Sequence, residues 1–235
     1  MSREGRRPEE LPYIQALSRI HAAVEPRTYL EIGVGEGTSL RLGAAAELCI
    51  GVDPEPHVPE DLARCCHLET TTSAAFFAGP RAQELLGARP VDLAFLDGLH
   101  LFEAVLRDFM NVEAFAGPGT LVVVHDCLPR DAETAARRRT TRFWTGDVWK
   151  LVPALREARP DLRVTLVDVA PSGLCLISGL RPGDASLRAA YRGLLERYLP
   201  LRYEEGETAQ GGPASLTLGL DEALALHGFA APGST

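Results

Sequence analysis

Two segments of the sequence place acids and histidines directly after apolar runs that have the pattern of strands. Asp97 and His100 lie in FLDGLHLFEAVLRDF, and His125 and Asp126 end the run TLVVVHD. Side chains that follow neighbouring strands of an open α/β sheet collect beyond the carboxyl ends of those strands. A histidine there can take the proton of an attacking hydroxyl, because its ordinary pKa of about 6.5 lies near working pH. His100 and His125 are therefore candidate general bases, with Asp97 beside them as a third catalytic candidate.

A second chemical signal is the glycine-rich turn in YLEIGVGEGTSLRLG, with Gly33, Gly35 and Gly37. Glycines between a strand end and a helix let a ligand approach the backbone, and the helix start offers free N–H groups. The spacing GxGxG departs from the dinucleotide fingerprint GxGxxG. Glu31 adds a negative charge that favours a cationic amine or sulfonium over a phosphate. Asp53 ends the next strand, where a carboxylate can accept both hydroxyls of a ribose.

The apolar pattern predicts the elements that must position these residues. Short apolar runs alternate with helical stretches, which is the rhythm of a parallel α/β sheet. The predicted strands are TYLEIGV, LCIGVD, VDLAFLD and TLVVVHD, and the predicted helices lie near residues 11–24, 36–46, 74–86, 101–115, 146–158 and 184–204. Later, LRVTLVDV and GLCLISGL are separated only by APSG, which is too short for a crossover helix. These last two strands must therefore pair antiparallel.

Composition excludes several classes of protein. The chain has 235 residues, enough for one sizeable core, and a net charge of −8, which argues against a nucleic-acid binder. No apolar run approaches the ~20 residues that span a bilayer, and the start MSREGRRPEE lacks a signal-peptide pattern. The five cysteines are odd in number and form no CxxC pair, which suits a reducing compartment. We expect a cytoplasmic protein.

The sequence resembles the class I S-adenosylmethionine-dependent methyltransferases over roughly residues 28–180. EIGVGEG is similar to their first motif, GVD to their acidic second-strand motif, and DVAPSGLCLIS to their antiparallel strand pair. The resemblance implies a Rossmann-like methyltransferase sheet over residues 28–180, flanked by an N-terminal tail and helix (1–27) and a C-terminal helical appendix (181–235).

The same resemblance assigns roles in binding S-adenosylmethionine. The three glycines would face its methionine part, Glu31 its ammonium group and Asp53 its ribose. Asp97 would contact the cofactor as well. Thr72 and Ser73, in TTTS, would lie near the adenine. A helix N-cap is the alternative role for these two residues.

The pair of segments DGLH…RDF and PG…HD resembles a bacterial methyltransferase subgroup found among natural-product and sugar-modifying enzymes. It partly resembles the catechol-type O-methyltransferases, in which an Asp and a later Asp-Asn pair hold magnesium. Asp97 falls on the first ligand, but His125 and Asp126 replace the pair. The resemblance thus implies a metal site of Asp97, His125 and Asp126, and the imidazole favours a transition metal or none over magnesium.

The stretch ARRRTTRFWTGDVWKLVP resembles an acceptor-binding segment of the same subgroup. It implies acceptor contacts from Trp144, Asp147, Trp149 and Lys150. Core burial is the alternative for Trp149, and a mobile solvated loop is expected for Arg137 to Arg139. Further alternatives remain for two other groups of residues: His100 as a backbone cap at a helix start, and Glu103 and Asp108 as solvated or paired with Arg107.

The sequence therefore predicts a methyltransferase acting on a small-molecule hydroxyl, with S-adenosylmethionine and a divalent metal as cofactors. A non-methylating relative similar to cephalosporin hydroxylases, or a module that only binds S-adenosylmethionine, is the alternative. A homodimer is a further hypothesis, because the C-terminal helix has an apolar stripe that packs either on its own sheet or on a second subunit. The stripe consists of Leu187, Tyr191, Leu194, Leu195 and Tyr198.

Overall fold

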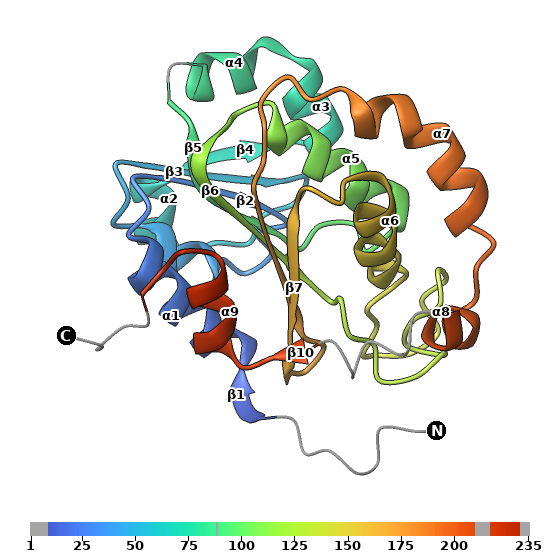
Figure 1. Cartoon of the computed structure of the whole chain (residues 1–235). Helices are drawn as coiled ribbons and strands as arrows, with labels where there is room; N and C mark the ends of the chain where they lie inside the picture. Colours follow the sequence, from blue (N-terminus) through green and yellow to red (C-terminus); the bar gives the residue numbers. More distant parts are fainter. Residues whose placement is uncertain (1–8, 88, 210–216, 231–235) are drawn as a thin grey trace.

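The computed structural model describes residues 9–87, 89–209 and 217–230, and an eight-stranded sheet lies at its centre (Figure 1). The strand order is β10-β7-β9-β6-β5-β2-β3-β4. The strands are β2 (Thr28–Ile32), β3 (Leu48–Asp53), β4 (His67–Thr70), β5 (Val91–Leu96), β6 (Ala116–His125), β7 (Arg163–Val167), β9 (Leu174–Ser178) and β10 (Thr217–Leu218). Neighbours pair parallel, except that β9 is antiparallel to both β6 and β7. The predicted parallel α/β sheet with a late antiparallel pair is confirmed.

Helices cover both faces of the sheet (Figure 1). One face carries α1 (Tyr13–Val24), α2 (Glu60–Cys65) and α9 (Leu220–Leu226). The other carries α3 (Ser73–Ala78), α4 (Pro80–Leu86), α5 (Phe102–Glu113), α6 (Leu151–Ala158) and α7 (Ser186–Tyr198). Consecutive strand residues point to opposite faces, so Tyr29 belongs to the first core and Leu30 to the second. Burial on both faces explains why the strands are continuous apolar runs.

The N-terminal segment is attached to the sheet edge where the candidate site lies. A short strand, β1 (Glu9–Pro12), pairs parallel with β8 (Val169–Ala170), which leads into the turn before β9. α1 follows β1 directly and packs against the first core through Ala16, Leu17 and Ile20. The N-terminal segment therefore lies close to the residues that precede β9.

The predicted helix at 36–46 is wrong in extent, because only one 3₁₀ turn, η1 (Leu40–Gly43), forms there. Gly37 has a φ of +76°, which keeps a helix from starting earlier. A Cβ on Gly43 would lie 2.0 Å from the ring of Tyr29, so the chain must turn in close contact with β2. The predicted helix at 74–86 divides into α3 and α4, because Gly79 is extended and Pro80 starts a new helix.

The segments predicted to flank the 28–180 core are built into the same two cores. α7 buries Leu187, Leu194 and Tyr198 on one face of the sheet, and β10 extends the sheet beside β7. The rest of the C-terminal part holds α8 (Tyr203–Ala209) and α9. The apolar stripe of α7 thus packs on its own chain. Among the described residues, no helix is long and apolar enough to cross a membrane.

Candidate active site

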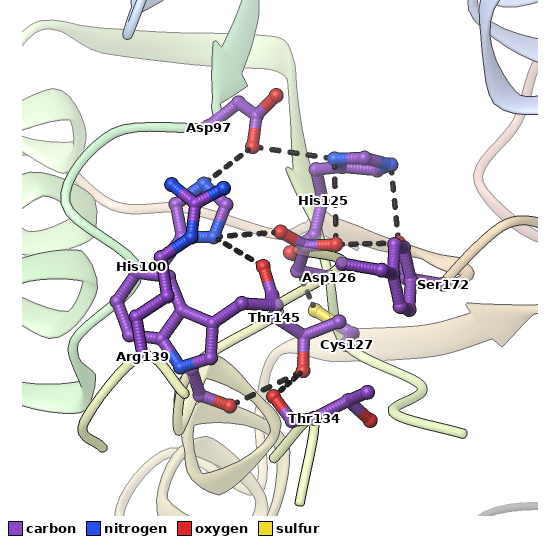
Figure 2. Close-up of polar contacts among 12 residues, drawn as sticks. Asp97, His100, His125, Asp126, Cys127, Thr134, Arg139, Thr145 and Ser172 are labelled. Carbon is purple, nitrogen blue, oxygen red and sulfur yellow. Dashed lines mark hydrogen bonds and ion pairs between the residues drawn. The ribbon is translucent and has the colours of Figure 1, made fainter. Parts of the chain in front are cut away.

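The acids and histidines that follow β5 and β6 form one cluster at the carboxyl edge of the sheet (Figure 2). Oδ1 of Asp97 lies 3.2 Å from Nδ1 of His125 and 3.3 Å from Nε2 of His100. Nδ1 of His100 lies 2.9 Å from Oδ2 of Asp126. Because β5 and β6 are adjacent and parallel, the residues after them meet at one edge. The structure therefore brings together all four residues singled out from the sequence.

Two members of this cluster have an unusual backbone conformation. His100 has a φ of +58° and Asp126 a φ of +61°, in the left-handed region that side-chain-bearing residues seldom occupy. Each such residue costs on the order of 1 to 3 kcal/mol, and such residues gather at functional sites. His100 starts no helix, since Leu101 precedes α5 as its N-cap residue. Its ring is instead directed at the two carboxylates, and the backbone-cap alternative does not apply to the side chain.

A residue that the sequence analysis missed completes the cluster. Ser172, in the turn between β8 and β9, donates a hydrogen bond to Oδ1 of Asp126, and its Oγ lies 3.3 Å from Nε2 of His125. The order Asp97, His125, Ser172 matches that of a hydrolase triad. However, Ser172 is only 1% exposed and its hydroxyl proton is directed at Asp126. Ser172 therefore positions its neighbours and is no nucleophile.

Tyr13, at the start of α1, is a second missed residue. Its ring centroid lies 4.3 Å from that of His125, so α1 covers one side of the cluster. Burial, followed by the charges of Asp97, Glu31 and Asp126, raises the pKa of the Tyr13 phenol. The phenol therefore stays protonated beside three acids that belong to three different strand ends.

The charges in the cluster are strongly coupled. Burial lowers the pKa of His100, but hydrogen bonds to Asp126 and Asp97 outweigh it and raise that pKa to about 10. Burial also lowers the pKa of His125. The charge of Asp97 and the hydrogen bond to it outweigh burial, so the pKa of His125 is raised. Burial raises the pKa of Asp97, yet the two histidines bring it well below its usual range. The carboxylates thus hold two positive charges next to them, which is the electrostatics of a cation site.

A metal ion has a suitable donor set here. One ligand atom from each of Asp97, His100 and Asp126 lies within 4.8 Å of the others. The sequence had implied His125 as the imidazole ligand, but the ring of His100 lies between the two carboxylates and His125 lies beside them, 3.2 and 3.6 Å from Asp97 and Asp126. Two carboxylates and an imidazole suit zinc, manganese or iron better than magnesium.

The glycine turn serves both the fold and a ligand. A Cβ on Gly33 would lie 2.1 Å from the carbonyl oxygen of Asp97, so this glycine is required for β2 and the β5 end to meet. A Cβ on Gly35 would find no atom within 4 Å. Open space beside the backbone is what a bound cofactor needs. The side chains around Gly37 are Val58 and Leu62, which belong to the fold.

Asp53 and Glu31, the two acids predicted to bind the cofactor, both accept hydrogen bonds from groups of the protein. Asp53 accepts the N–H groups of Val34 at 2.8 Å and Gly35 at 3.0 Å, so it fixes the turn while retaining further acceptor sites for a ribose. Glu31 is 0% exposed and accepts the hydroxyls of Tyr29 and Ser39. Burial raises the pKa of Glu31 to about 8. A direct contact of Glu31 with an ammonium group stays a prediction.

A small pocket extends from the cluster toward α5 and is lined by Asp97, Leu99, His100, Val105, Asp108 and His125. Burial raises the pKa of Asp108 to about 6, and Asp108 contacts Ser73. Asp108 is buried, so the solvated alternative is wrong, whereas the charge of Arg107 does act on Asp108 and lowers its pKa. Thr72 caps α3 by accepting the N–H of Ala75, which is the alternative role expected for it. Ser73, through Asp108, connects the predicted adenine side with this pocket.

The residues assigned to the acceptor separate into two groups. Trp144 stacks on His100 and is directly at the site. Asp147 and Lys150 are buried, and their side chains pair with each other at 3.1 Å. Lys150 also donates to the carbonyl of Leu199, and Trp149 packs edge-on against Tyr203. The structure corrects the assignment of these three residues: they hold the loop in the core.

Part of the basic loop is fixed as well. Arg137 pairs with Glu103 at 2.8 Å and with Asp147 at 2.8 Å, which ties residues 127–147 to α5. The expected solvated role of Arg137 and the expected pairing of Glu103 with Arg107 are therefore wrong. These ion pairs fix the loop on both sides of Trp144, the residue that stacks on His100.

The fold and the strand-end cluster define the methyltransferase arrangement of an open α/β sheet. A family model described as a methyltransferase domain matches residues 30–127, from β2 to just past the cluster. Over these residues the chain therefore matches a methyltransferase domain, in agreement with the resemblance. Among curated proteins, none matches the chain in sequence.

Several solved structures share this fold. The O-methyltransferase TomG of Streptomyces achromogenes, involved in tomaymycin synthesis and solved with SAM, is 18% identical over 71% of this chain and 78% of its own, with a TM-score of 0.56. The O-methyltransferase of Bacillus cereus solved with SAH is 16% identical over 70% of this chain and 79% of its own, with a TM-score of 0.53. A Podospora anserina methyltransferase with SAH is 13% identical over 71% of this chain and 77% of its own, with a TM-score of 0.52.

Proposed function

We propose that this protein transfers the methyl group of S-adenosylmethionine to a hydroxyl of a small molecule. The observation that carries the proposal is the placement of the Asp97, His100, His125 and Asp126 cluster beside the open face of the Gly35 turn. The similar folds of O-methyltransferases solved with SAM or SAH support it. S-adenosylmethionine, when bound, supplies an electrophilic methyl group.

The residues of the chain align the acceptor and receive its proton. Asp97 and Asp126 present carboxylate oxygens at adjacent strand ends, where an acceptor hydroxyl can donate a hydrogen bond. As the acceptor oxygen forms its bond to the methyl carbon, the hydroxyl proton must leave for a basic atom. The carboxylate oxygens of Asp97 and Asp126 are the basic atoms nearest to such an acceptor, because both ring nitrogens of His125 already face other groups. Holding the reactants in line contributes most of the rate, and proton removal adds typically a hundredfold or more.

We include a divalent transition metal in the proposal. Asp97, His100 and Asp126 would hold it, and it would act as a Lewis acid that lowers the pKa of the acceptor hydroxyl. The two carboxylates on either side of the His100 ring supply the negative charge that a cation needs, and metal binding there would release the proton of His100. The five free cysteines accord with a cytoplasmic location.

The test measures binding and turnover separately. Calorimetry with S-adenosylmethionine and S-adenosylhomocysteine should give micromolar binding, and S-adenosylhomocysteine should accumulate when catechols or sugars are added. Matched ethers that lack the free hydroxyl are the control and should give no product. Cofactor binding without methyl transfer to any hydroxyl of the panel would favour the non-methylating relative or the binding module. Absence of cofactor binding would contradict the proposal.

A further inference from the structure

The loop that contains Trp144 carries four exposed arginines that form no ion pair with an acid in the described part of the chain. Twelve of the twenty arginines in that part form ion pairs with acids. Of the eight others, half lie within the thirteen residues 130–142 of this loop: Arg130, Arg138, Arg139 and Arg142. We refer to these four as the arginine rim. Asp131 and Glu133 lie in the same stretch, but neither forms an ion pair with the arginine rim in the described part of the chain.

Two guanidinium groups of the arginine rim are held in place by neutral partners. The guanidinium of Arg130 lies 4.2 Å above the ring of Phe143, and its Nε donates to the carbonyl of Pro171 at 3.4 Å. Arg139 donates to the carbonyls of Thr141 and Arg142 at 3.3 and 3.0 Å. These contacts orient the side chains and leave their positive charges without neutralisation.

The arginine rim borders the cluster on two sides. Pro171 precedes Ser172, which donates to Asp126, so Arg130 lies beside the turn that holds the cluster. Arg139 and Arg142 lie in the same loop as Trp144, whose ring stacks on His100. Both ends of the arginine rim are therefore connected to the cluster, Arg130 through Pro171 and Arg139 through the loop that holds Trp144.

We propose that the arginine rim binds an oxyanion, carboxylate or phosphate, carried by the methyl acceptor. Arginine is suited to both groups, since its planar fork donates two parallel hydrogen bonds to them. At the cluster itself, the imidazoles of His100 and His125 already pair with carboxylates, so the positive charge that is free for the acceptor's anionic group lies on the arginine rim. The proposal rests on the proposed function, because it names the acceptor class of that site.

The experiment is calorimetry on the full chain, first titrated with S-adenosylhomocysteine and then with three probes of one size: benzoate, phenyl phosphate and neutral benzamide. The anions should bind at least about tenfold more tightly than benzamide, with an affinity that falls as sodium chloride is raised. The tighter of the two anions identifies carboxylate or phosphate as the preferred group. Arg139→Gln combined with Arg142→Gln should remove this preference. Arg188→Gln, an exposed change on α7 away from the rim, is the matched control and should retain it.

Equal affinity for the three probes, or no anion binding at millimolar concentration, would overturn the inference. An anion preference that survives in the double variant would overturn it too, because the anions would then bind elsewhere. The two proposals fail separately. Loss of S-adenosylhomocysteine binding in the first titration contradicts methyl transfer, whereas loss of the anion preference with intact S-adenosylhomocysteine binding contradicts only the arginine rim.

Discussion

The indole ring of Trp144 lies almost parallel to the imidazole of His100, with ring centroids 5.4 Å apart and 12° between the planes. The indole N–H donates to the carbonyl of Ala136, and Nδ1 of His100 lies 3.3 Å from the Trp144 carbonyl. The loop therefore covers one face of a residue at the centre of the cluster. A change in the loop can therefore reach the cluster through this stack and through the contact of Nδ1 with the Trp144 carbonyl.

Replacing Trp144 should reduce turnover without weakening cofactor binding. Trp144→Ala removes the ring that stacks on His100. We expect kcat to fall by about tenfold or more, because small losses in the alignment of the reacting groups slow transfer reactions strongly. Trp144→Phe retains a ring and should restore most of the rate. S-adenosylhomocysteine affinity, measured by calorimetry, should stay within about twofold in both variants. A matching loss of affinity would mean that the loop shapes the cofactor site as well.

Asp53→Ala should weaken S-adenosylhomocysteine binding. The carboxylate orders the turn through the N–H groups of Val34 and Gly35 and is the predicted ribose acceptor, so we expect a loss on the order of 2 to 4 kcal/mol by calorimetry. Asp53→Asn retains a carbonyl oxygen for the turn. Its affinity for S-adenosylhomocysteine should therefore lie between that of the wild type and that of Asp53→Ala. An unchanged affinity in Asp53→Ala would remove this residue from the cofactor site.

The sequence predicted those parts of the site that follow strands. An apolar run fixes where a strand ends, and parallel strands end at one edge, so Asp97 and Asp126 could be placed together from the sequence alone. The face of a helix or loop is harder to predict, because it depends on packing against distant residues. Asp147, Trp149 and Lys150 had the composition of a binding loop, but their partners Leu199 and Tyr203 lie about fifty residues later.

Ser172 and Tyr13 could not be identified from local pattern. Ser172 lies in a turn that the sequence showed only as a short APSG linker, and its role arises from the antiparallel pairing of β9 with β6 beside His125. Tyr13 belongs to a segment assigned outside the core, which β1 attaches to β8. The one signal available was the aromatic at the start of an amphipathic helix, and core packing explains such a residue equally well.

Glu31 should make stability depend on pH. Its pKa is about 8 in the folded chain against 4.5 ordinarily, so between these values the unfolded chain has released a proton that the folded chain retains. The free energy of unfolding should therefore fall as pH rises from about 4.5 to 8, by at most about 1.4 kcal/mol per pH unit from this residue. Urea unfolding at pH 5, 6.5 and 8 measures it. Glu31→Gln should flatten the decline, and Glu196→Gln, exposed on α7, should leave it unchanged. Parallel curves for wild type and Glu31→Gln would contradict the raised pKa.

Metal removal distinguishes the two roles open to the cluster. Two carboxylates that face each other across His100 are stabilised either by protons on the histidines or by a divalent ion, and the donor set of Asp97, His100 and Asp126 fits the ion. We expect elemental analysis to find a transition metal, a chelator to lower turnover by roughly a hundredfold, and added zinc or manganese to restore it. Asp126→Asn and His100→Gln should lose the metal and resist restoration, with thermal melting as the check on folding. His125→Gln should retain the metal and still lower turnover, since it removes the imidazole that pairs with Asp97. Full turnover in excess chelator, with no metal in the purified protein, would contradict the metal and leave the acids and histidines of the cluster to receive the proton themselves.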